Sequence, residues 1–187
     1  MCIFAVLYKY RVMKNYISVA ILAALLLTSC ANEFNKVYKT SDYSYKYEYA
    51  KECFAKGKYV RASTLLQGLV TMQKGTDNAQ ESLYMLGMAE YNSKEYDGAA
   101  ATFKKYFASY PKGTYAENAE YYVGMRLYNL TPEPRLDQSQ TVNAISAFQD
   151  YLDLFPDGNR RDEAQQRLFE LQDKLVQKEL HSAQLYY

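Results

Sequence analysis

Small and large apolar residues recur at helical spacing along most of the chain, and the pattern is clearest over residues 83–111. Leu83 and Gly87 lie about one helical turn apart, and Ala99 and Phe103 repeat that spacing on the next segment. Because Gly87 and Ala99 carry almost no side chain, two antiparallel helices can approach closely there. Leu83 and Phe103 are then predicted to fill the seam between them.

The same pattern occurs on both sides of this stretch. Ala50, Gly87 and Gly124 are each 37 residues apart, a period typical of helical-hairpin repeats. In the third pair the second helix comes eight residues later, because an insertion with Pro132 and Pro134 cannot continue a helix. Helix pairs are therefore predicted at 42–56 with 58–73, 78–93 with 95–109, and 115–129 with 140–155.

A further long helix is predicted from Arg161 onward. This stretch contains neither Gly nor Pro, keeps Leu168 and Leu175 at helical spacing, and has room for up to about 27 residues. Residues 183–187 look like the small and aromatic positions of another first helix, and no second helix follows. A half-present repeat leaves an apolar face uncovered, so we expect the chain to be truncated at its C-terminal end or capped by a partner.

Together these elements predict an all-α fold: a tetratricopeptide-type helical-hairpin solenoid with a right-handed superhelix over residues 42–187. It would hold three complete repeats and a partial fourth. With 49% apolar residues in 187, the chain can bury a substantial core. It has 21 Tyr and no Trp, so tyrosine rings must line packed seams or a surface groove.

The first 29 residues have the organisation of a bacterial lipoprotein signal peptide. Three basic residues precede an apolar run at 16–27, which is too short to span a bilayer. The run ends in Leu-Thr-Ser before Cys30, as in the lipobox, so Cys30 is predicted to be the first mature residue and to carry lipid. A buried Cys after an ordinary signal is the alternative. Met13 is an alternative start, and residues 30–41 are predicted to be a polar tether.

The three cysteines of the chain are not expected to form an intrachain disulfide. Cys2 is lost with the signal, Cys30 is used for lipid, and Cys53 lies on an apolar helix face. The helical repeats must therefore be stabilised by packing.

Charge and side-chain inventory argue against several classes of function. The chain has 22 Lys and Arg against 21 Asp and Glu, which gives no general attraction for nucleic acid. It has one His, His181, and shows no nucleophile with a His partner, no Gly-rich phosphate loop and no metal-ligand cluster. We therefore predict that the protein is not an enzyme and uses no cofactor and no metal. His181 is expected to be a solvated helix residue, and Glu90 part of an ordinary solvated face.

The repeat period places large side chains at three equivalent positions on the first helix of each pair. Tyr and Met make an adaptable apolar surface with hydroxyls that can meet a peptide backbone. The concave face of such solenoids is where peptides bind, so these positions form the candidate peptide-binding groove. The alternative is that the rings pack between repeats, with at least two of the six partly exposed. These nine ladder residues are Tyr47, Tyr84 and Tyr121, then Lys51, Met88 and Met125, then Phe54, Tyr91 and Tyr128.

Three stretches carry a more specific signature: YPKGTYAENAEYYVG at 110–124, DQSQTVNAISAFQDYLDLFP at 137–156, and DEAQQRLFELQDKL at 162–175. Together with the lipobox, they make residues 43–187 resemble the BamD family of outer-membrane β-barrel assembly lipoproteins. That family has five tetratricopeptide repeats, more than this chain contains.

The resemblance implies a non-enzymatic scaffold, lipid-anchored on the periplasmic face of the outer membrane. It implies that later repeats dock on a BamA-like barrel-forming assembly protein and that early repeats receive unfolded β-barrel precursors. Two other readings remain open. One is a peptide-binding tetratricopeptide lipoprotein that coordinates cell-envelope or division work, and the other is a glycan-binding lipoprotein of the nutrient-import type.

Overall fold

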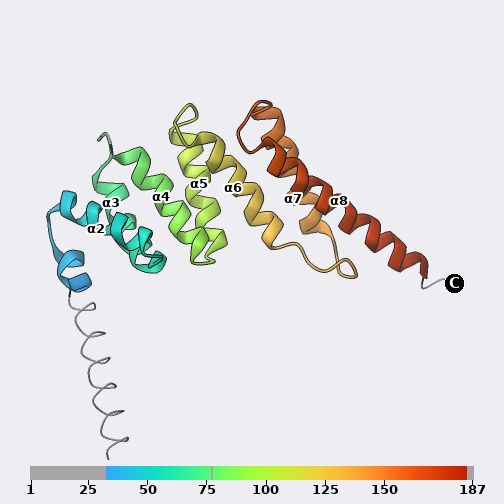
Figure 1. The fold of residues 1–187 in the computed structure, drawn as a ribbon, viewed down its shortest axis with the longest axis horizontal. Coiled ribbons are helices and arrows are strands. Elements are labelled where there is room, and N and C mark those ends of the chain that lie inside the picture. Colours follow the sequence, from blue (N-terminus) through green and yellow to red (C-terminus); the bar gives the residue numbers. More distant parts are fainter. Residues whose placement is uncertain (1–32, 77, 185–187) are drawn as a thin grey trace, which may run out of the picture. The chain divides into compact units, whose positions relative to one another are not determined.

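The computed structural model describes residues 33–76 and 78–184, all of whose regular structure is helical. The predicted signal peptide and Cys30 lie outside the described residues. Within the described residues, a helical stretch at 33–39 is followed by the helices α2 to α8 in chain order (Figure 1). They are α2 (Tyr43–Ala55), α3 (Tyr59–Met72), α4 (Ala79–Asn92), α5 (Tyr96–Ser109), α6 (Ala116–Asn129), α7 (Ser139–Leu154) and α8 (Arg161–Gln184).

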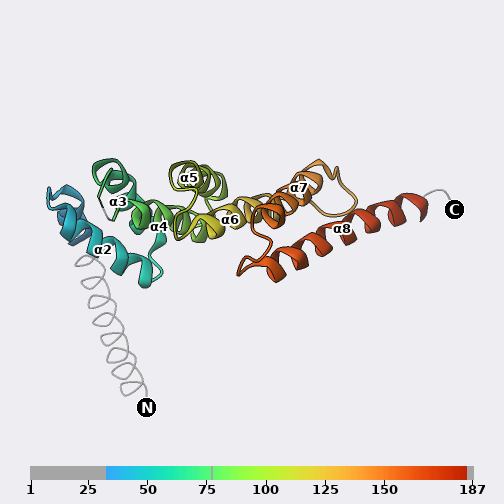
Figure 2. The same cartoon turned by 90° about the horizontal axis from the view of Figure 1, so that it is seen from above.

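The seven predicted helices are confirmed, with ends within one or two residues of expectation except at the C-terminal end of the long helix, and the pairing is confirmed for α4 with α5 and for α6 with α7. Consecutive helices from α3 to α8 pack on each other, and α8 also contacts α6. Seen from above, α3 and α5 lie in one layer and α4 and α6 in the other (Figure 2). This alternation is the arrangement of a helical-hairpin solenoid. None of the described helices is both long enough and apolar enough to cross a membrane.

The chain divides into two compact units between residues 49 and 50, so residues 33–49 are described separately. Residues 33–39, which lie within the predicted polar tether, are helical. Phe34 stacks on Tyr38 one turn later, with ring centroids 6.2 Å apart. At the next helix, Asp42 Oδ1 accepts a hydrogen bond from the Tyr45 N–H at 2.9 Å, which caps the start of α2.

The close approach of paired helices depends on glycine, as predicted. A Cβ atom added at Gly87 on α4 would lie 2.6 Å from Cε1 of Phe103 on α5, a ring that is fully buried. The equivalent Gly124 on α6 would place its Cβ 3.1 Å from Cε1 of Phe148 on α7. A side chain at Gly87 would therefore force the Phe103 ring or the helices to shift, whereas one at Gly124 would require the Phe148 ring to move by a few tenths of an ångström.

The insertion between α6 and α7 is organised by one buried amide. Gln138 Nε2 donates hydrogen bonds to the carbonyl oxygens of Glu133 at 2.8 Å and Leu136 at 3.1 Å. Its Oε1 accepts a hydrogen bond from Thr141 Oγ1 at 2.7 Å. Next to it, Asp137 Oδ1 accepts the Ser139 N–H at 3.0 Å, and hydrogen bonds from Ser139 lower the pKa of Asp137. The Asp-Gln pair therefore closes the loop and starts α7.

The exposure of Glu90 differs from the prediction. Glu90 was expected on a solvated face, but only 5% of it is exposed. Its Oε2 accepts a hydrogen bond from Thr102 Oγ1 of α5 at 2.7 Å, and Gly98 leaves room beside the carboxylate. Glu90 therefore joins the paired helices α4 and α5 as a satisfied buried polar group.

Candidate peptide-binding face

The nine ladder residues divide by burial. Tyr47, which belongs to the unit described separately, and Tyr121 are each 3% exposed. The other seven are half-buried, so four of the six ladder rings keep part of their surface in solvent. Those four are Phe54, Tyr84, Tyr91 and Tyr128.

Tyr84 joins α4 to the turn that enters α6. Its ring stacks on Tyr115 with centroids 4.3 Å apart and an interplanar angle of 4°. It also contacts Tyr106 at 6.0 Å and Phe103 at 5.9 Å. Burial raises the pKa of the Tyr84 phenol to about 12. Most of this ring therefore stabilises the junction between the second and third repeats.

Tyr122 connects the ladder to the helix seam, although the repeat pattern did not predict an aromatic residue with this role. Its ring lies edge-on to Tyr91 at 4.8 Å and stacks on Phe103 at 5.3 Å. The Tyr91 hydroxyl also accepts a hydrogen bond from Asn129 Nδ2 at 2.9 Å. The residue 37 positions before Tyr122 is Met85, so comparison of the repeats did not mark this site as aromatic.

Tyr121 is buried because α7 and the start of α8 cover it. Its ring makes edge contacts with Phe148 at 5.9 Å and Tyr151 at 5.7 Å. The guanidinium of Arg160 lies 4.8 Å from the Tyr121 centroid and 5.4 Å from that of Tyr122. A cation over two phenol rings stabilises this junction and keeps Tyr121 away from any ligand.

Arg160 is itself held in place by hydrogen bonds. Its Nε donates to Asn118 Oδ1 at 2.6 Å and its Nη1 donates to Glu163 Oε2 at 2.6 Å. Its backbone N–H donates to Glu117 Oε1 at 3.1 Å, the atom that also accepts the Tyr151 hydroxyl at 2.9 Å. Burial, and then the hydrogen bond to Glu117, raise the pKa of Tyr151. Arg160 precedes α8 and lies outside the positions that recur between repeats, so the sequence pattern did not predict its role.

Tyr128 links the end of α6 to the middle of α8. Its hydroxyl donates to Glu170 Oε2 at 2.5 Å, and the Arg167 guanidinium lies 5.1 Å from its ring centroid. Arg167 Nη1 also donates to Glu170 Oε2 at 2.8 Å. The hydrogen bond from Tyr128, together with Arg167, lowers the pKa of Glu170 below the ordinary value of a glutamate side chain, 4.5.

The Glu170 carboxylate should make the free energy of unfolding depend on pH. A lowered folded-state pKa means that its contribution is present above the unfolded value near 4.5 and is lost as pH falls through the folded value. Because the Glu170 side chain is about one-third exposed, we expect E170Q to cost below about 1 kcal/mol at neutral pH. Urea unfolding of both proteins from pH 7 to pH 3 should show this difference shrinking below pH 4.5.

The exposed Glu179 on the same helix provides the matched control. E179Q makes the same chemical change where the structure gives the side chain no partner among the described residues. If E179Q and E170Q lose the same stability at every pH, the Tyr128–Glu170 contact does not have the assigned role.

The remaining ladder residues are Lys51, Phe54, Met88 and Met125. Lys51 Nζ lies 3.9 Å from Glu81 Oε1 on α4, and Phe54 packs edge-on to Tyr59 at 5.4 Å. Met88 and Met125 are half-buried among the tyrosines of α4 and α6. The face thus combines flexible thioethers with the exposed edges of phenol rings, a surface that can adapt to apolar side chains.

The ladder residues line none of three cavities that the structure forms among its described residues. One of these, of about 130 Å³, lies beside Val70, Leu83 and Tyr110. The described residues also contain no group of three or more His, Cys, Asp or Glu side chains placed to hold a metal ion. Seven of the nine ladder residues are nevertheless partly exposed to solvent.

The helices and their glycine seams define a helical-repeat protein of the tetratricopeptide type. Residues 39–187 match the family model YfiO, described as outer membrane lipoprotein, and the chain belongs to that family. It is similar to the outer membrane protein assembly factor BamD of Caulobacter vibrioides, with 21% identity over 170 residues. This match covers 89% of the chain and 56% of the relative, so the chain spans little more than half of that relative's length.

Proposed function

We propose that this protein is a non-enzymatic scaffold of the outer-membrane β-barrel assembly machinery. In this proposal Cys30 carries a lipid that holds the protein on the periplasmic face of the outer membrane. The family match over residues 39–187 supports the proposal, as does the similarity to an assembly factor. A BamA-like barrel-forming protein would be its partner.

The binding step is assigned to the open face of α4 and α6. Met88 and Met125 occupy equivalent positions there, flanked by the partly exposed rings of Tyr84, Tyr91 and Tyr128. An extended segment of an unfolded barrel precursor carries apolar and aromatic side chains on one side. These side chains would pack against the thioethers and ring edges while the chain remained extended. The row of equivalent half-buried apolar side chains is the observation that carries this proposal.

Site-specific photocrosslinking tests the assignment. A benzophenone amino acid at residue 88 or 125 should crosslink to unfolded barrel precursors in cells, because both methionines are partly exposed and lie outside the tightest ring contacts. Residues 47 and 121 are unsuitable because their rings are buried.

The control position is Lys104, an exposed residue on α5. We expect little or no precursor adduct from residue 104. Equal adducts from residues 88, 125 and 104, or no precursor adduct from residues 88 and 125, would contradict the binding face.

A further inference from the structure

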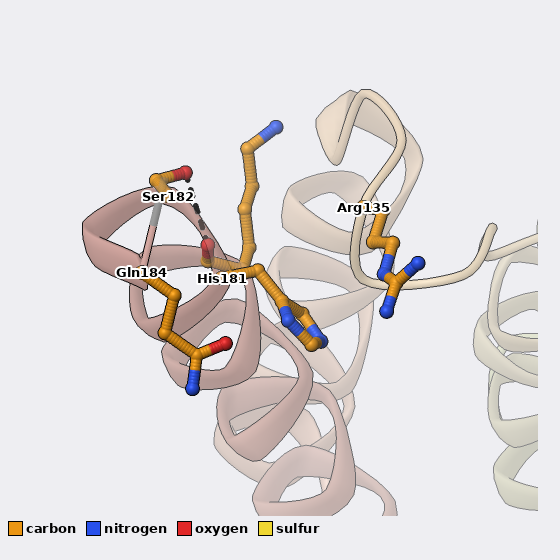
Figure 3. A pocket seen from close by; sticks show the side chains of 5 residues that line it. Arg135, His181, Ser182 and Gln184 are labelled. Atoms are coloured by element: carbon orange, nitrogen blue, oxygen red, sulfur yellow. Dashed lines mark hydrogen bonds between the residues drawn. The ribbon is translucent and has the colours of Figure 1, made fainter. Parts of the chain in front are cut away.

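A cavity of about 330 Å³ lies between the insertion that precedes α7 and the last turns of α8. Arg135 lines it from the insertion, and α8 contributes the rest of the lining. Figure 3 shows the Arg135 guanidinium and the His181 imidazole pointing toward one another from these two elements. The residues from α8 are Lys178, His181, Ser182 and Gln184.

The cavity is rich in positive charge that carboxylates do not neutralise directly. Lys178 Nζ donates to the carbonyl oxygen of Leu136 at 3.0 Å, so its ammonium group holds the loop through a neutral acceptor. The exposed Arg135 side chain has no hydrogen bond or ion pair to the described residues. The nearby carboxylate of Asp137 interacts with Lys178 through charge, but its Oδ1 already accepts the Ser139 N–H.

Neutral hydrogen-bonding groups complete the lining. His181 is half-buried here instead of fully solvated as the sequence analysis expected, and its ring nitrogens can donate or accept. Gln184 offers both an amide donor and a carbonyl acceptor. Ser182 donates to the Lys178 carbonyl oxygen at 3.0 Å and keeps its lone pairs available (Figure 3). Leu136, 58% exposed, adds an apolar side chain on the adjacent loop.

We propose that this cavity binds an acidic side chain of an extended peptide segment from a protein partner. The Arg135 guanidinium can provide charge-assisted hydrogen bonds to a carboxylate, and the Lys178 ammonium group in the same lining adds positive charge. Gln184 and Ser182 can form hydrogen bonds with the neighbouring peptide groups, and Leu136 can pack against an adjacent apolar side chain. A net charge of +1 gives the protein no general attraction to an anionic membrane, which favours a polypeptide over a lipid headgroup. This site is separate from the ladder residues, so it does not depend on precursor binding there.

Fluorescence anisotropy with two labelled peptides tests the proposal on the full chain in zwitterionic detergent. One peptide alternates Leu and Glu, and its neutral twin alternates Leu and Gln. We expect the Glu peptide to bind at least about fivefold more tightly, and R135Q to remove most of that preference because it removes a charge-assisted contact. R161Q is the control, since it removes the same charge from an exposed residue at the other end of α8.

Several results would overturn the proposal. Equal affinity for the two peptides would show that no carboxylate is recognised, and equal losses in R135Q and R161Q would indicate general charge attraction. Competition by inorganic phosphate or phosphatidylglycerol vesicles at lower concentration than the Glu peptide would assign the cavity to phosphate groups. Circular dichroism of R135Q should match that of the unchanged protein, so lost binding will not reflect unfolding. The assay measures peptide binding directly, so its outcome is independent of the barrel-assembly proposal.

Discussion

Replacing Gly87 by Leu is expected to destabilise the solenoid by forcing apart the seam between α4 and α5. Even a Cβ atom at this position would lie 2.6 Å from Cε1 of Phe103, and the next two ring atoms are 2.9 Å away. Phe103 is fully buried and stacks on Tyr122, so its ring cannot move without disturbing the third repeat. Overpacking a filled core costs about 1 to 3 kcal/mol and can cost more where the backbone must shift.

Thermal unfolding followed by circular dichroism measures this effect. For a chain of this size, about 1 to 3 kcal/mol corresponds to a Tm lowered by roughly 2 to 12 °C. The matched control is Gly68→Leu on α3, where an added Cβ has no neighbour within 4 Å. There Leu should raise the Tm slightly, because glycine is an unfavourable residue inside a helix.

The two glycines should therefore respond with opposite signs to the same substitution. An unchanged or raised Tm in Gly87→Leu would show that the α4–α5 seam is placed wrongly. A further variant, Gly87→Ala with Phe103→Leu, should recover stability relative to Gly87→Ala alone, because the smaller side chain returns space to the seam.

The sequence predicted the helices and their seams because repetition amplifies a weak signal. A single glycine on an apolar helix face has several explanations. Glycines at the same position of two repeats, Gly87 and Gly124, have one explanation in common, which is the close approach of paired helices. The helix at residues 33–39 was missed although Phe34, Val37 and Tyr38 have helical spacing. Short helices are marginal on their own, so three apolar residues in an isolated segment are a weak signal for one.

Repetition predicted the positions of the ladder residues but not their exposure. Tyr84 and Tyr121 are equivalent in sequence, yet Tyr84 is half-buried and Tyr121 is 3% exposed. Arg160 and the residues around it cover Tyr121, and Arg160 belongs to a segment that breaks the 37-residue period. The exposure of a side chain depends on the segments that pack over it. Repeats with different insertions have different segments at this place, so equivalent residues differ in exposure.

The cavity lined by Arg135 and the last turns of α8 could not be located from the sequence for a related reason. Arg135 lies in the insertion and His181 near the end of α8, and only the packing of the insertion against α8 brings them to one space. Gln138 was noticed as part of a sequence signature, while its role is visible only in its hydrogen bonds to Glu133 and Leu136. The loop geometry that Gln138 fixes is what places Arg135 beside α8.

Replacing Cys30 by Ala is expected to move the protein from the membrane fraction to the soluble fraction. In the proposed function, the lipid on Cys30 is the membrane anchor, and this variant lacks it. Acyl chains contribute about 0.8 kcal/mol per buried CH₂, so losing two or more chains removes nearly all membrane affinity. Fractionation of cells with detection of the protein in each fraction measures the change.

Cys53→Ala is the control for this experiment. Cys53 is a free cysteine, 3% exposed, and burial raises the pKa of its thiol, so it is a packed side chain away from lipid chemistry. Its loss should lower stability modestly and leave the protein in the membrane fraction. Metabolic labelling with a fatty acid should mark the unchanged protein and Cys53→Ala but not Cys30→Ala. Continued membrane association of an unlabelled Cys30→Ala protein would mean that protein contacts, and not a lipid, hold the solenoid at the membrane.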